Sequence, residues 1–321
     1  MTLRTLGRTS LMVTPLGMGC WPISGITSTD VNEADSLATI REASAAGINF
    51  FDTAYCYGFD GESERMLALV LRQDRDKIVL ASKGGIHWID GKQVRCGRPE
   101  RLQHECDESL RRLQTDRIDL YYLHAPDPDI PIEESAGAIG ELIRQGKVLS
   151  AGLSNASTEL LARFQAVCPL TAFQPHFNML QREIEDSQLS WCVERDVAVV
   201  VYWPLMKGLL AGHLPREHVF DAKDGRRKYP MFSGDEWQKN QDFLDDLRAM
   251  SLELGRPVSQ IVLNWTIQRA GITVALCGAK RPHQIRENAA AMNWSLTDAQ
   301  IARINRAIAA RGSIISKSAV S

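Results

Sequence analysis

Short apolar runs alternate with segments of helical spacing along almost the whole chain, and this alternation constrains the fold more than any other feature. The apolar runs lie near Gly17 and at residues 47–51, 77–83, 118–124, 148–154, 171–174, 197–203 and 272–278. Strands that alternate with helices are typical of a parallel sheet, because each crossover needs a helix to return the chain. Eight such units predict an α/β fold, a (β/α)8 TIM barrel.

The segments between the apolar runs carry helix-start and helix-end signals. Asp30 is the predicted N-cap of a first helix, and Gly47 suits the left-handed exit from it. Pro99 and Pro131 stand where a proline begins a helix, in its first turn. Further helices are predicted at about 184–195, 236–254, 258–269, 282–291 and 297–310.

The chain is predicted to form one domain over residues 1–321, opened by an N-terminal β-hairpin around Gly7 and Arg8. No linker, composition break or low-complexity tract divides the sequence. A doubly wound sheet is the rival fold. It usually begins with a Gly-rich turn, but "GMGCWP" at 17–22 has only the first two glycines of that turn and proline in place of the third.

Charge and cysteine content disfavour several classes of protein. A formal net charge of −2 gives no global field that would attract nucleic acid or an acidic membrane, so neither partner is expected. Seven cysteines without a C-x-x-C pair argue against a disulfide framework and a structural zinc site. They favour a reducing compartment, and with no recognisable secretory leader we expect a cytoplasmic protein. His213 and His218 lack a third ligand, so no metal site is predicted.

Titratable side chains follow three successive predicted strands. Asp52 ends the second strand, Lys83 the third and His124 the fourth, and Tyr55 and Tyr57 follow Asp52. The carboxyl ends of barrel strands meet at one mouth, so these groups are expected to converge there. The residues alone leave open which of the two tyrosines takes part in chemistry.

Seven stretches of the chain resemble, in order and spacing, the signature sequences of the aldo-keto reductases. They are "GINFFDTAYCYGFDGESERML", "VLASK", "DLYYLHAPDP", "GKVLSAGLSNAS", "FQPHFNML", "YWPLMKGLLAG" and "GAKRPHQIREN". The resemblance runs from about residue 3 to 310 and implies a (β/α)8 barrel that binds NADP(H) without a Rossmann domain. The catalytic tyrosine of that family precedes a glycine, five positions after the aspartate of a D-T-A turn. The resemblance therefore assigns this role to Tyr57 and not to Tyr55.

The resemblance implies a catalytic set that reduces an aldehyde or ketone by hydride transfer, made of Asp52, Tyr57, Lys83 and His124. Tyr57 would be the general acid, because the carbonyl oxygen gains negative charge as hydride arrives. A free tyrosine has a pKa of about 10, and the Lys83 ammonium would lower it. Asp52 would hold Lys83 charged. His124 would donate a hydrogen bond to the substrate oxygen.

The same resemblance assigns residues to the nicotinamide cofactor. Ser154, Asn155 and Gln174 match groups that hydrogen-bond the carboxamide. Tyr202 matches the ring that stacks on the nicotinamide. The phosphate and adenosine parts would be held by Leu205, Gly208, Leu210, Gly278, Ala279, Lys280, Arg281, Gln284, Glu287 and Asn288. The two cations in this set suit a 2′-phosphate, which favours NADP(H), with NAD(H) as the alternative.

The chain also departs from the family pattern. Cys277 stands where the family often has proline, and Trp203 where it often has serine. Trp203 would therefore reshape the seat of the nicotinamide. The segment after residue 310 is short for a long substrate loop, so the substrate pocket is expected at Trp21, Trp88 and residues 213–235.

Three functions stay open from the sequence. The first is an NADP(H)-dependent reductase of a small-molecule aldehyde or ketone. The second is a dehydrogenase that oxidises a sugar or other alcohol with NAD(P)+. The third is a weakly catalytic subunit that senses the cofactor within a larger complex, which the complete set of four catalytic residues disfavours. The physiological substrate and the oligomeric state do not follow from the sequence.

Overall fold

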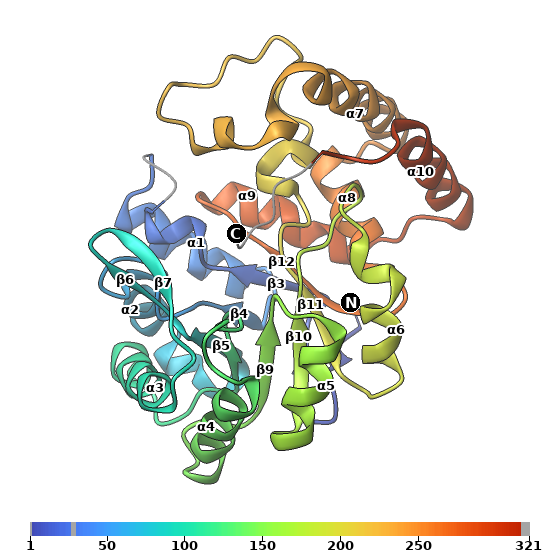
Figure 1. Cartoon of the computed structure of the whole chain (residues 1–321). Helices are drawn as coiled ribbons and strands as arrows, with labels where there is room; N and C mark the ends of the chain where they lie inside the picture. The colour runs from blue at the N-terminus through green and yellow to red at the C-terminus, as the bar shows by residue number, and fades with distance from the viewer. Residues whose placement is uncertain (1, 27–29, 316–321) are drawn as a thin grey trace.

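In the computed structural model, which describes residues 2–26 and 30–315, eight parallel strands form a closed barrel with helices around it (Figure 1). The predicted (β/α)8 barrel is therefore confirmed, and each predicted apolar run overlaps one strand of it. These strands are β3 (Leu16–Gly19), β4 (Phe50–Asp52), β5 (Val79–Gly84), β8 (Leu120–Leu123), β9 (Ala151–Ser154), β10 (Leu170–Gln174), β11 (Ala198–Val201) and β12 (Ile272–Cys277).

The barrel closes between β12 and β3, its last and first strands. Cys277 of β12 pairs with Met18 of β3, and Ala275 pairs with Leu16. Closure leaves the barrel sheet without a free edge, so the strand ends form two rims. The carboxyl rim is the one where polar side chains gather in enzymes of this fold.

Helices follow the strands and cover the outside of the barrel (Figure 1). They are α1 (Glu33–Ala45), α2 (Glu62–Leu71), α3 (Pro99–Leu113), α4 (Ile132–Arg144), α5 (Thr158–Val167), α6 (Gln188–Val193), α7 (Gly234–Leu254), α8 (Val258–Ile267), α9 (Pro282–Ala289) and α10 (Asp298–Arg311). None of the helices within the described ranges is both long and apolar enough to cross a membrane.

Short 3-10 helices stand in several connections. They are η1 (Pro22–Ser24), η2 (Arg72–Lys77), η3 (Glu183–Asp186), η4 (Met206–Ala211), η5 (Gly225–Lys228), η6 (Pro230–Phe232) and η7 (Ala290–Asn293). The single helix predicted at 184–195 is wrong, because it divides into η3 and α6. Ser187 between them has φ −155° and ψ −38°, which is not helical.

The predicted cap of α1 is also wrong. Asn32 is the N-cap, and its side-chain oxygen accepts from the backbone N–H of Asp35 at 2.9 Å. Asp30 lies outside the helix, and its carboxylate instead accepts from the Lys280 ammonium at 3.0 Å. Gly47 adopts the left-handed conformation that the sequence indicates, with φ +86°.

The predicted N-terminal hairpin is confirmed as β1 (Arg4–Thr5) paired antiparallel with β2 (Met12–Val13). Leu6 and Val13 are fully buried and belong to the same apolar cluster as the barrel residues Phe50 and Tyr122. The hairpin therefore packs into the core of the barrel.

One glycine on a barrel strand is required by packing. A Cβ atom at Gly152 would lie 2.2 Å from Cδ1 of Tyr122, whose ring is fully buried. The same ring has its centroid 5.8 Å from the Lys83 ammonium nitrogen. Packing inside the barrel thus extends directly to the groups at the carboxyl rim.

A hairpin that was not predicted follows β5. It consists of β6 (Ile86–Ile89) and β7 (Lys92–Arg95), which pair antiparallel beside the barrel (Figure 1). Trp88 pairs with Gln93 within it. The hairpin brings this tryptophan to the rim next to the loop that follows β4.

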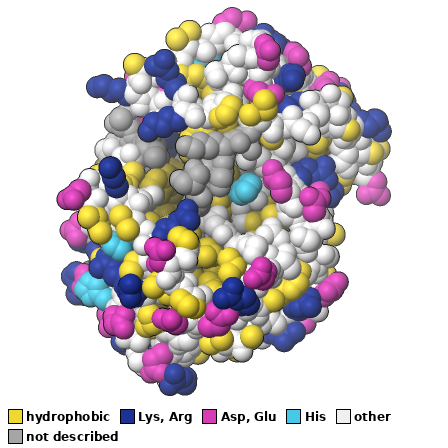
Figure 2. Space-filling model, in the orientation of Figure 1, with side chains coloured by type: hydrophobic (Ala, Val, Ile, Leu, Met, Phe, Trp, Pro, Cys, Tyr) yellow, Lys and Arg dark blue, Asp and Glu magenta, His cyan; other side chains and the backbone are white. Residues whose placement is uncertain are grey.

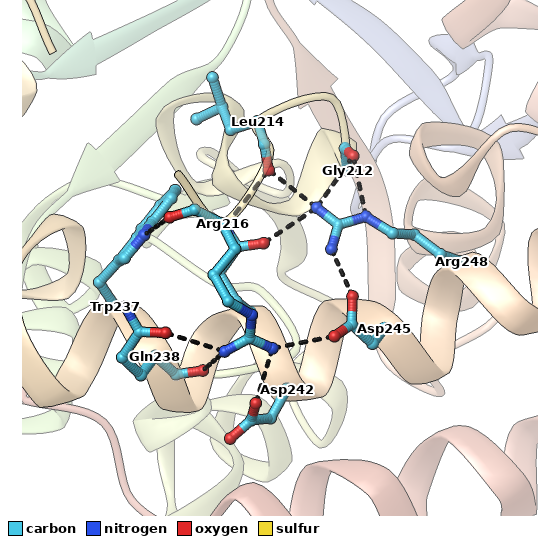
Figure 3. A network of polar contacts seen from close by, with 9 residues as sticks. Gly212, Leu214, Arg216, Trp237, Gln238, Asp242, Asp245 and Arg248 are labelled. Atoms are coloured by element: carbon cyan, nitrogen blue, oxygen red, sulfur yellow. Dashed lines mark hydrogen bonds and ion pairs between the residues drawn. The ribbon is translucent and has the colours of Figure 1, made fainter. Parts of the chain in front are cut away.

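The chain that leaves η4 is tied back to α7 by two arginines (Figure 3). Arg216 donates to the carboxylates of Asp242 and Asp245 at 2.7 and 2.9 Å. Arg248 donates to Asp245 at 2.6 Å and to the backbone oxygen of Gly212 at 3.3 Å. Because Asp245 accepts from both guanidinium groups, the exit of η4 is anchored on α7.

Candidate active site

The four residues predicted to be catalytic lie together at the carboxyl rim of the barrel. Asp52 is the last residue of β4, Lys83 lies near the end of β5, and His124 follows β8. Tyr57 lies in the loop between β4 and α2, where the backbone N–H of residue 57 donates to the oxygen of Ala54 at 3.0 Å. This turn brings the tyrosine back over the strand ends.

Lys83 is fully buried and makes three polar contacts. Its ammonium forms an ion pair with Asp52 and donates to the backbone oxygen of Thr53 at 2.8 Å. It also lies 3.4 Å from the hydroxyl oxygen of Tyr57. A buried charge needs such partners because its hydration is lost, and here one of the partners is the proposed acid.

Asp52 is held by two donors from different strands. One carboxylate oxygen pairs with Lys83, and the other accepts from the side-chain amide of Gln174 at 2.7 Å. Burial raises the pKa of Asp52, and the charge of Lys83 and the Gln174 amide oppose that rise. Sequence reasoning assigned Gln174 to the cofactor and did not find its bond to Asp52, because the two lie 122 residues apart.

The pKa of Tyr57 differs in direction from the sequence expectation. Removal from water raises the pKa of Tyr57 well above its usual value, although the residue is half-buried, and the Asp52 charge raises it further. Lys83 was expected to lower it, but its charge is shared with the Asp52 carboxylate. The phenol therefore keeps its proton at neutral pH and is available as a donor.

His124 completes the group as a neutral imidazole. Burial, and then the charge of Lys83, lower the pKa of His124 well below its usual value. Its ring meets the Tyr57 ring edge-on, with the centroids 5.8 Å apart. A neutral ring beside a phenol offers a second hydrogen-bonding group at the same place.

Tyr55 occupies a different environment from Tyr57. The Arg112 guanidinium lies over the Tyr55 ring at 4.4 Å from its centroid, and Arg101 lies at 5.6 Å. Only the backbone N–H of Tyr55 reaches Lys83, donating to its carbonyl oxygen at 3.0 Å. Of the two tyrosines, Tyr57 is the one whose hydroxyl faces the lysine ammonium.

The residues predicted to bind the carboxamide form a chain of hydrogen bonds. Ser154 donates to the backbone oxygen of Gln174 at 2.8 Å, and the Asn155 amide donates to the Ser154 hydroxyl at 2.9 Å. The Tyr202 hydroxyl donates to the Asn155 side-chain oxygen at 2.7 Å. Asn155 has φ +57°, which is uncommon for a residue with a side chain. These four predicted residues are thus one connected group.

Sequence reasoning missed a caged cation in η4. The Lys207 ammonium lies 4.1 Å from the Trp203 ring centroid and 4.5 Å from that of Tyr229. Burial lowers the pKa of Lys207 to about 8, and within the described ranges it has no carboxylate partner. The signal for such a site is the pair of Trp203 and Lys207 at a spacing of four, but Tyr229 joins it only through the fold.

The predicted phosphate segment is a tight turn rather than a regular helix. The backbone N–H groups of Gly208 and Leu210 both donate to the Leu205 oxygen, at 2.9 and 3.2 Å. Lys207 and Gly208 have positive φ values of 55° and 89°. The turn packs beside the segment of η5, since a Cβ atom at Gly208 would lie 3.9 Å from the Arg226 guanidinium.

The residues predicted to hold the adenosine end surround the start of α9. Gln284 accepts through its side-chain oxygen from the backbone N–H groups of Lys280 and Arg281, at 2.9 and 3.2 Å. Both cations are paired with the segment before α1: Lys280 with the Asp30 carboxylate, and Arg281 with the Asp30 backbone oxygen at 2.6 Å. This acidic neighbour was not anticipated for the predicted phosphate site.

The remaining members of the predicted set differ in exposure. The Glu287 carboxylate accepts from the hydroxyl of Ser259 at 2.6 Å, and Asn288 is only 4 % exposed. Ala279 is buried, and a Cβ atom at Gly278 would lie 2.6 Å from Pro22. Asn288 and Ala279 are thus buried, Glu287 is half-buried with a polar partner, and Gly278 is exposed at the close approach to Pro22.

The two tryptophans predicted to line the substrate pocket flank Tyr57. The Trp21 ring meets the Tyr57 ring edge-on, with centroids 5.0 Å apart. The Trp88 indole donates to the Cys56 backbone oxygen at 2.9 Å. Figure 2 shows hydrophobic and basic side chains around the middle of the face that it draws. No three His, Cys, Asp or Glu residues in the described part of the chain are grouped to hold a metal ion.

Comparison with known proteins identifies the family of the chain. The model of the "Aldo/keto reductase family" matches residues 15–309. The chain is similar to aldo-keto reductase YhdN of Bacillus subtilis (strain 168), with 33% identity over 94% of this chain and 92% of that protein. It is also 30% identical to probable aldo-keto reductase 1 of Glycine max, over 94% of this chain and 88% of that one.

Solved structures give the same result. The glycerol dehydrogenase AKR11B4 from Gluconobacter oxydans superposes with a TM-score of 0.90 at 32% identity, covering 97% of this chain and 96% of that one. The aldo-keto reductase AKR11C1 from Bacillus halodurans, in a holo form, superposes with a TM-score of 0.78 at 27% identity, covering 100% of this chain and 98% of that one. With the family model matched over most of its length, the chain belongs to the aldo/keto reductase family of oxidoreductases.

Proposed function

We propose that the protein reduces an aldehyde or ketone to an alcohol with NADP(H), using Tyr57 as the general acid. The observation that carries this proposal is the buried Lys83 ammonium, which pairs with Asp52 and lies 3.4 Å from the Tyr57 hydroxyl. A phenol that gives up a proton becomes an anion, and a fixed ammonium beside it lowers the cost of that anion. This arrangement suits a step in which negative charge develops at the site.

The side chains around the site fit a nicotinamide dinucleotide. Asn155 and Ser154 offer amide and hydroxyl groups for a carboxamide, and Tyr202 offers a ring. Lys207, Lys280 and Arg281 offer cations for phosphates, with Lys207 caged between two rings and without a carboxylate partner in the described chain. When bound, the nicotinamide would supply or accept the hydride.

The protein's own groups would then act on the substrate oxygen. His124, being neutral, would donate a hydrogen bond and orient the carbonyl. Tyr57 would transfer its proton to that oxygen as negative charge grows there. Lys83 would stabilise the resulting phenolate, and Asp52 with Gln174 would hold the ammonium in position. In the reverse direction the phenolate would accept the alcohol proton.

A dehydrogenase that oxidises an alcohol is the second candidate. It is favoured by the similarity to the Gluconobacter oxydans glycerol dehydrogenase, whose name states oxidation of a small polyol. One observation also favours NAD(H) for this second candidate: the Asp30 carboxylate accepts from Lys280. A carboxylate near the adenosine ribose would bind a free 2′-hydroxyl better than a 2′-phosphate.

We also propose that the protein works in the cytoplasm on a small-molecule substrate. All seven cysteines are free, and six of them are buried, which fits a reducing compartment. The flanking Trp21 and Trp88 would contact the substrate beside Tyr57.

The deciding experiment measures binding and turnover separately. The purified protein is titrated with NADPH and with NADH while tryptophan fluorescence is followed, since Trp203 lies beside the proposed cofactor seat. Consumption of NADPH is then measured with a panel of aldehydes and ketones, and formation of NADPH or NADH with glycerol and sugars. Turnover in the first panel supports the reductase, turnover only in the second supports the dehydrogenase, and no binding of either nucleotide contradicts both.

A further inference from the structure

A cysteine that no catalytic role includes lies directly against the proposed orienting histidine. The sulfur of Cys56 is 3.6 Å from the Nδ1 atom of His124. Cys56 is fully buried in a small cluster with Ala54, Ile86 and Ala125, whose side chains are apolar. Within the described ranges the thiol has no other side-chain or backbone acceptor.

The protonation states of the two groups restrict how this contact forms. Burial raises the pKa of Cys56 to about 12, so the sulfur keeps its hydrogen at neutral pH. His124 is neutral, so its ring carries one hydrogen, either on Nδ1 or on Nε2. If Nδ1 carried it, the S–H group would face apolar side chains without an acceptor, and Nδ1–H would rely on sulfur, which accepts weakly. If Nδ1 is bare, the thiol satisfies a strong acceptor that burial would otherwise leave unpaired.

We propose that Cys56 is a positioning residue whose S–H group donates to Nδ1 of His124 and holds the ring hydrogen on Nε2. The inference rests on the proposed function for its consequence, since only an Nε2–H group can donate to a substrate carbonyl oxygen. With the hydrogen on Nδ1, Nε2 would present a lone pair to that oxygen and repel it. One thiol thus sets whether the histidine acts as a donor.

The backbones of both residues are held independently of this contact. The carbonyl oxygen of Cys56 accepts from the Trp88 indole at 2.9 Å. The backbone N–H of His124 donates to Gly84 at 2.9 Å, and its carbonyl oxygen accepts from Asn155 at 3.1 Å. Replacing the thiol is therefore expected to change the hydrogen position on the ring while the ring keeps its place.

The direct test is the tautomer of His124 in the full-length protein. Long-range proton–nitrogen correlation spectra of the nitrogen-15-labelled protein report which ring nitrogen carries hydrogen, and His124→Gln identifies the signals. The wild type and Cys56→Ser, which keeps a donor, should show bare Nδ1 and protonated Nε2 between pH 6 and 8. Cys56→Val should move Nδ1 toward the protonated form, and the buried control Cys168→Val should not. Hydrogen on Nδ1 in the wild type, or an unchanged Cys56→Val spectrum, overturns the inference.

Kinetics supply the second test. Cys56→Val should lower kcat/KM for a carbonyl substrate by about 3- to 10-fold, the worth of one hydrogen bond, and leave the dissociation constant of NADPH unchanged. Cys56→Ser should restore the value to within about twofold. Equal losses of kcat/KM in Cys56→Val and Cys56→Ser would overturn the positioning role. If thermal melting shows that Cys56→Val does not fold, Cys56→Ala takes its place. A protein without carbonyl turnover would defeat the proposed function, and the spectra would still decide the role of Cys56.

Discussion

The ammonium nitrogen of Lys83 lies 3.4 Å from the hydroxyl oxygen of Tyr57, although Lys83 lies near the end of a barrel strand and Tyr57 belongs to the loop after the neighbouring strand. The contact joins a fully buried charge to a half-buried residue. Its consequence is that loss of the phenol should affect proton transfer and not the architecture around it.

Tyr57→Phe should therefore reduce kcat by about 10²- to 10⁴-fold, the usual contribution of a general acid, because it removes only the donated proton. NADPH affinity, measured by fluorescence titration, should stay within about twofold of the wild type. Tyr55→Phe is the matched control and should keep kcat within about threefold, because the Tyr55 ring packs on Arg112 away from the Lys83 ammonium. A larger loss in Tyr55→Phe than in Tyr57→Phe would refute the assignment.

Lys280 and Arg281 should discriminate between the two nucleotides. Their combined replacement by alanine should weaken NADPH binding by about 10- to 100-fold, the worth of charge-assisted hydrogen bonds to a 2′-phosphate, and NADH binding by less than about twofold. Asp30→Asn should strengthen NADPH binding a few-fold, because it removes a carboxylate that holds Lys280 at 3.0 Å. Dissociation constants from fluorescence titration test both; equal weakening of the two nucleotides would count against a 2′-phosphate site.

Lys207 should bind a part that both nucleotides share. Lys207→Met should weaken NADPH and NADH equally, by about tenfold, because it removes a caged cation next to the proposed pyrophosphate turn. Burial lowers the pKa of Lys207 to about 8, so the ammonium is present below that pH and wild-type affinity should fall as pH rises through it. Lys223→Met is the control, because Lys223 is exposed and lies between η4 and η5. Affinity that is flat between pH 7 and 9 would exclude this role.

Glu105 should make stability depend on pH. It is fully buried, and its carboxylate accepts from the Gly85 N–H at 2.6 Å. Burial raises the pKa of Glu105 from 4.5 to about 7, so the folded protein binds a proton that the unfolded chain has lost. The stability that the raised pKa of Glu105 contributes is fully present below about pH 4.5, and it is lost as the pH rises through about 7.

Glu105→Gln keeps an acceptor for the Gly85 N–H but cannot titrate. The free energy of unfolding of the variant minus that of the wild type should therefore increase from pH 5 to pH 8, by an amount on the order of 2 kcal/mol. Urea unfolding at both pH values gives the two free-energy differences. The exposed Glu100→Gln on the same helix should give the same difference at both. If Glu105→Gln behaves like Glu100→Gln, the buried carboxyl does not titrate as described.

Gly152→Ala should destabilise the barrel by about 2 kcal/mol or more, because the new methyl group would lie 2.2 Å from the fixed ring of Tyr122. Gly137→Ala, inside α4 with no atom close to its Cβ position, should instead stabilise by about 0.5–1 kcal/mol. Urea unfolding of both variants measures the change in the free energy of unfolding, which should be negative for Gly152→Ala and positive for Gly137→Ala. A neutral Gly152→Ala would mean that the Tyr122 ring has room to move.

Local patterns predicted much of the fold. Each of the eight apolar runs became a barrel strand, and the hairpin around Gly7 formed as expected, since these signals act over a few residues. The helix at 184–195 and the cap at Asp30 were wrong for the same reason. A break at Ser187, and an Asp30 drawn to Lys280 across 250 residues, depend on neighbours that a local pattern does not contain.

The sequence by itself determined the order of elements, the identity of the candidate groups at the strand ends and membership in the family. The tertiary structure decided what those groups do to one another. In the folded chain the Gln174 amide donates to the Asp52 carboxylate, and the Tyr229 ring contacts the Lys207 ammonium. Burial of Tyr57 raises its pKa, where the sequence had predicted that Lys83 would lower it. The physical reason is that pKa values and hydrogen-bond partners depend on burial and on charges a few ångströms away, and only the closed barrel brings strands that are far apart in sequence to that distance.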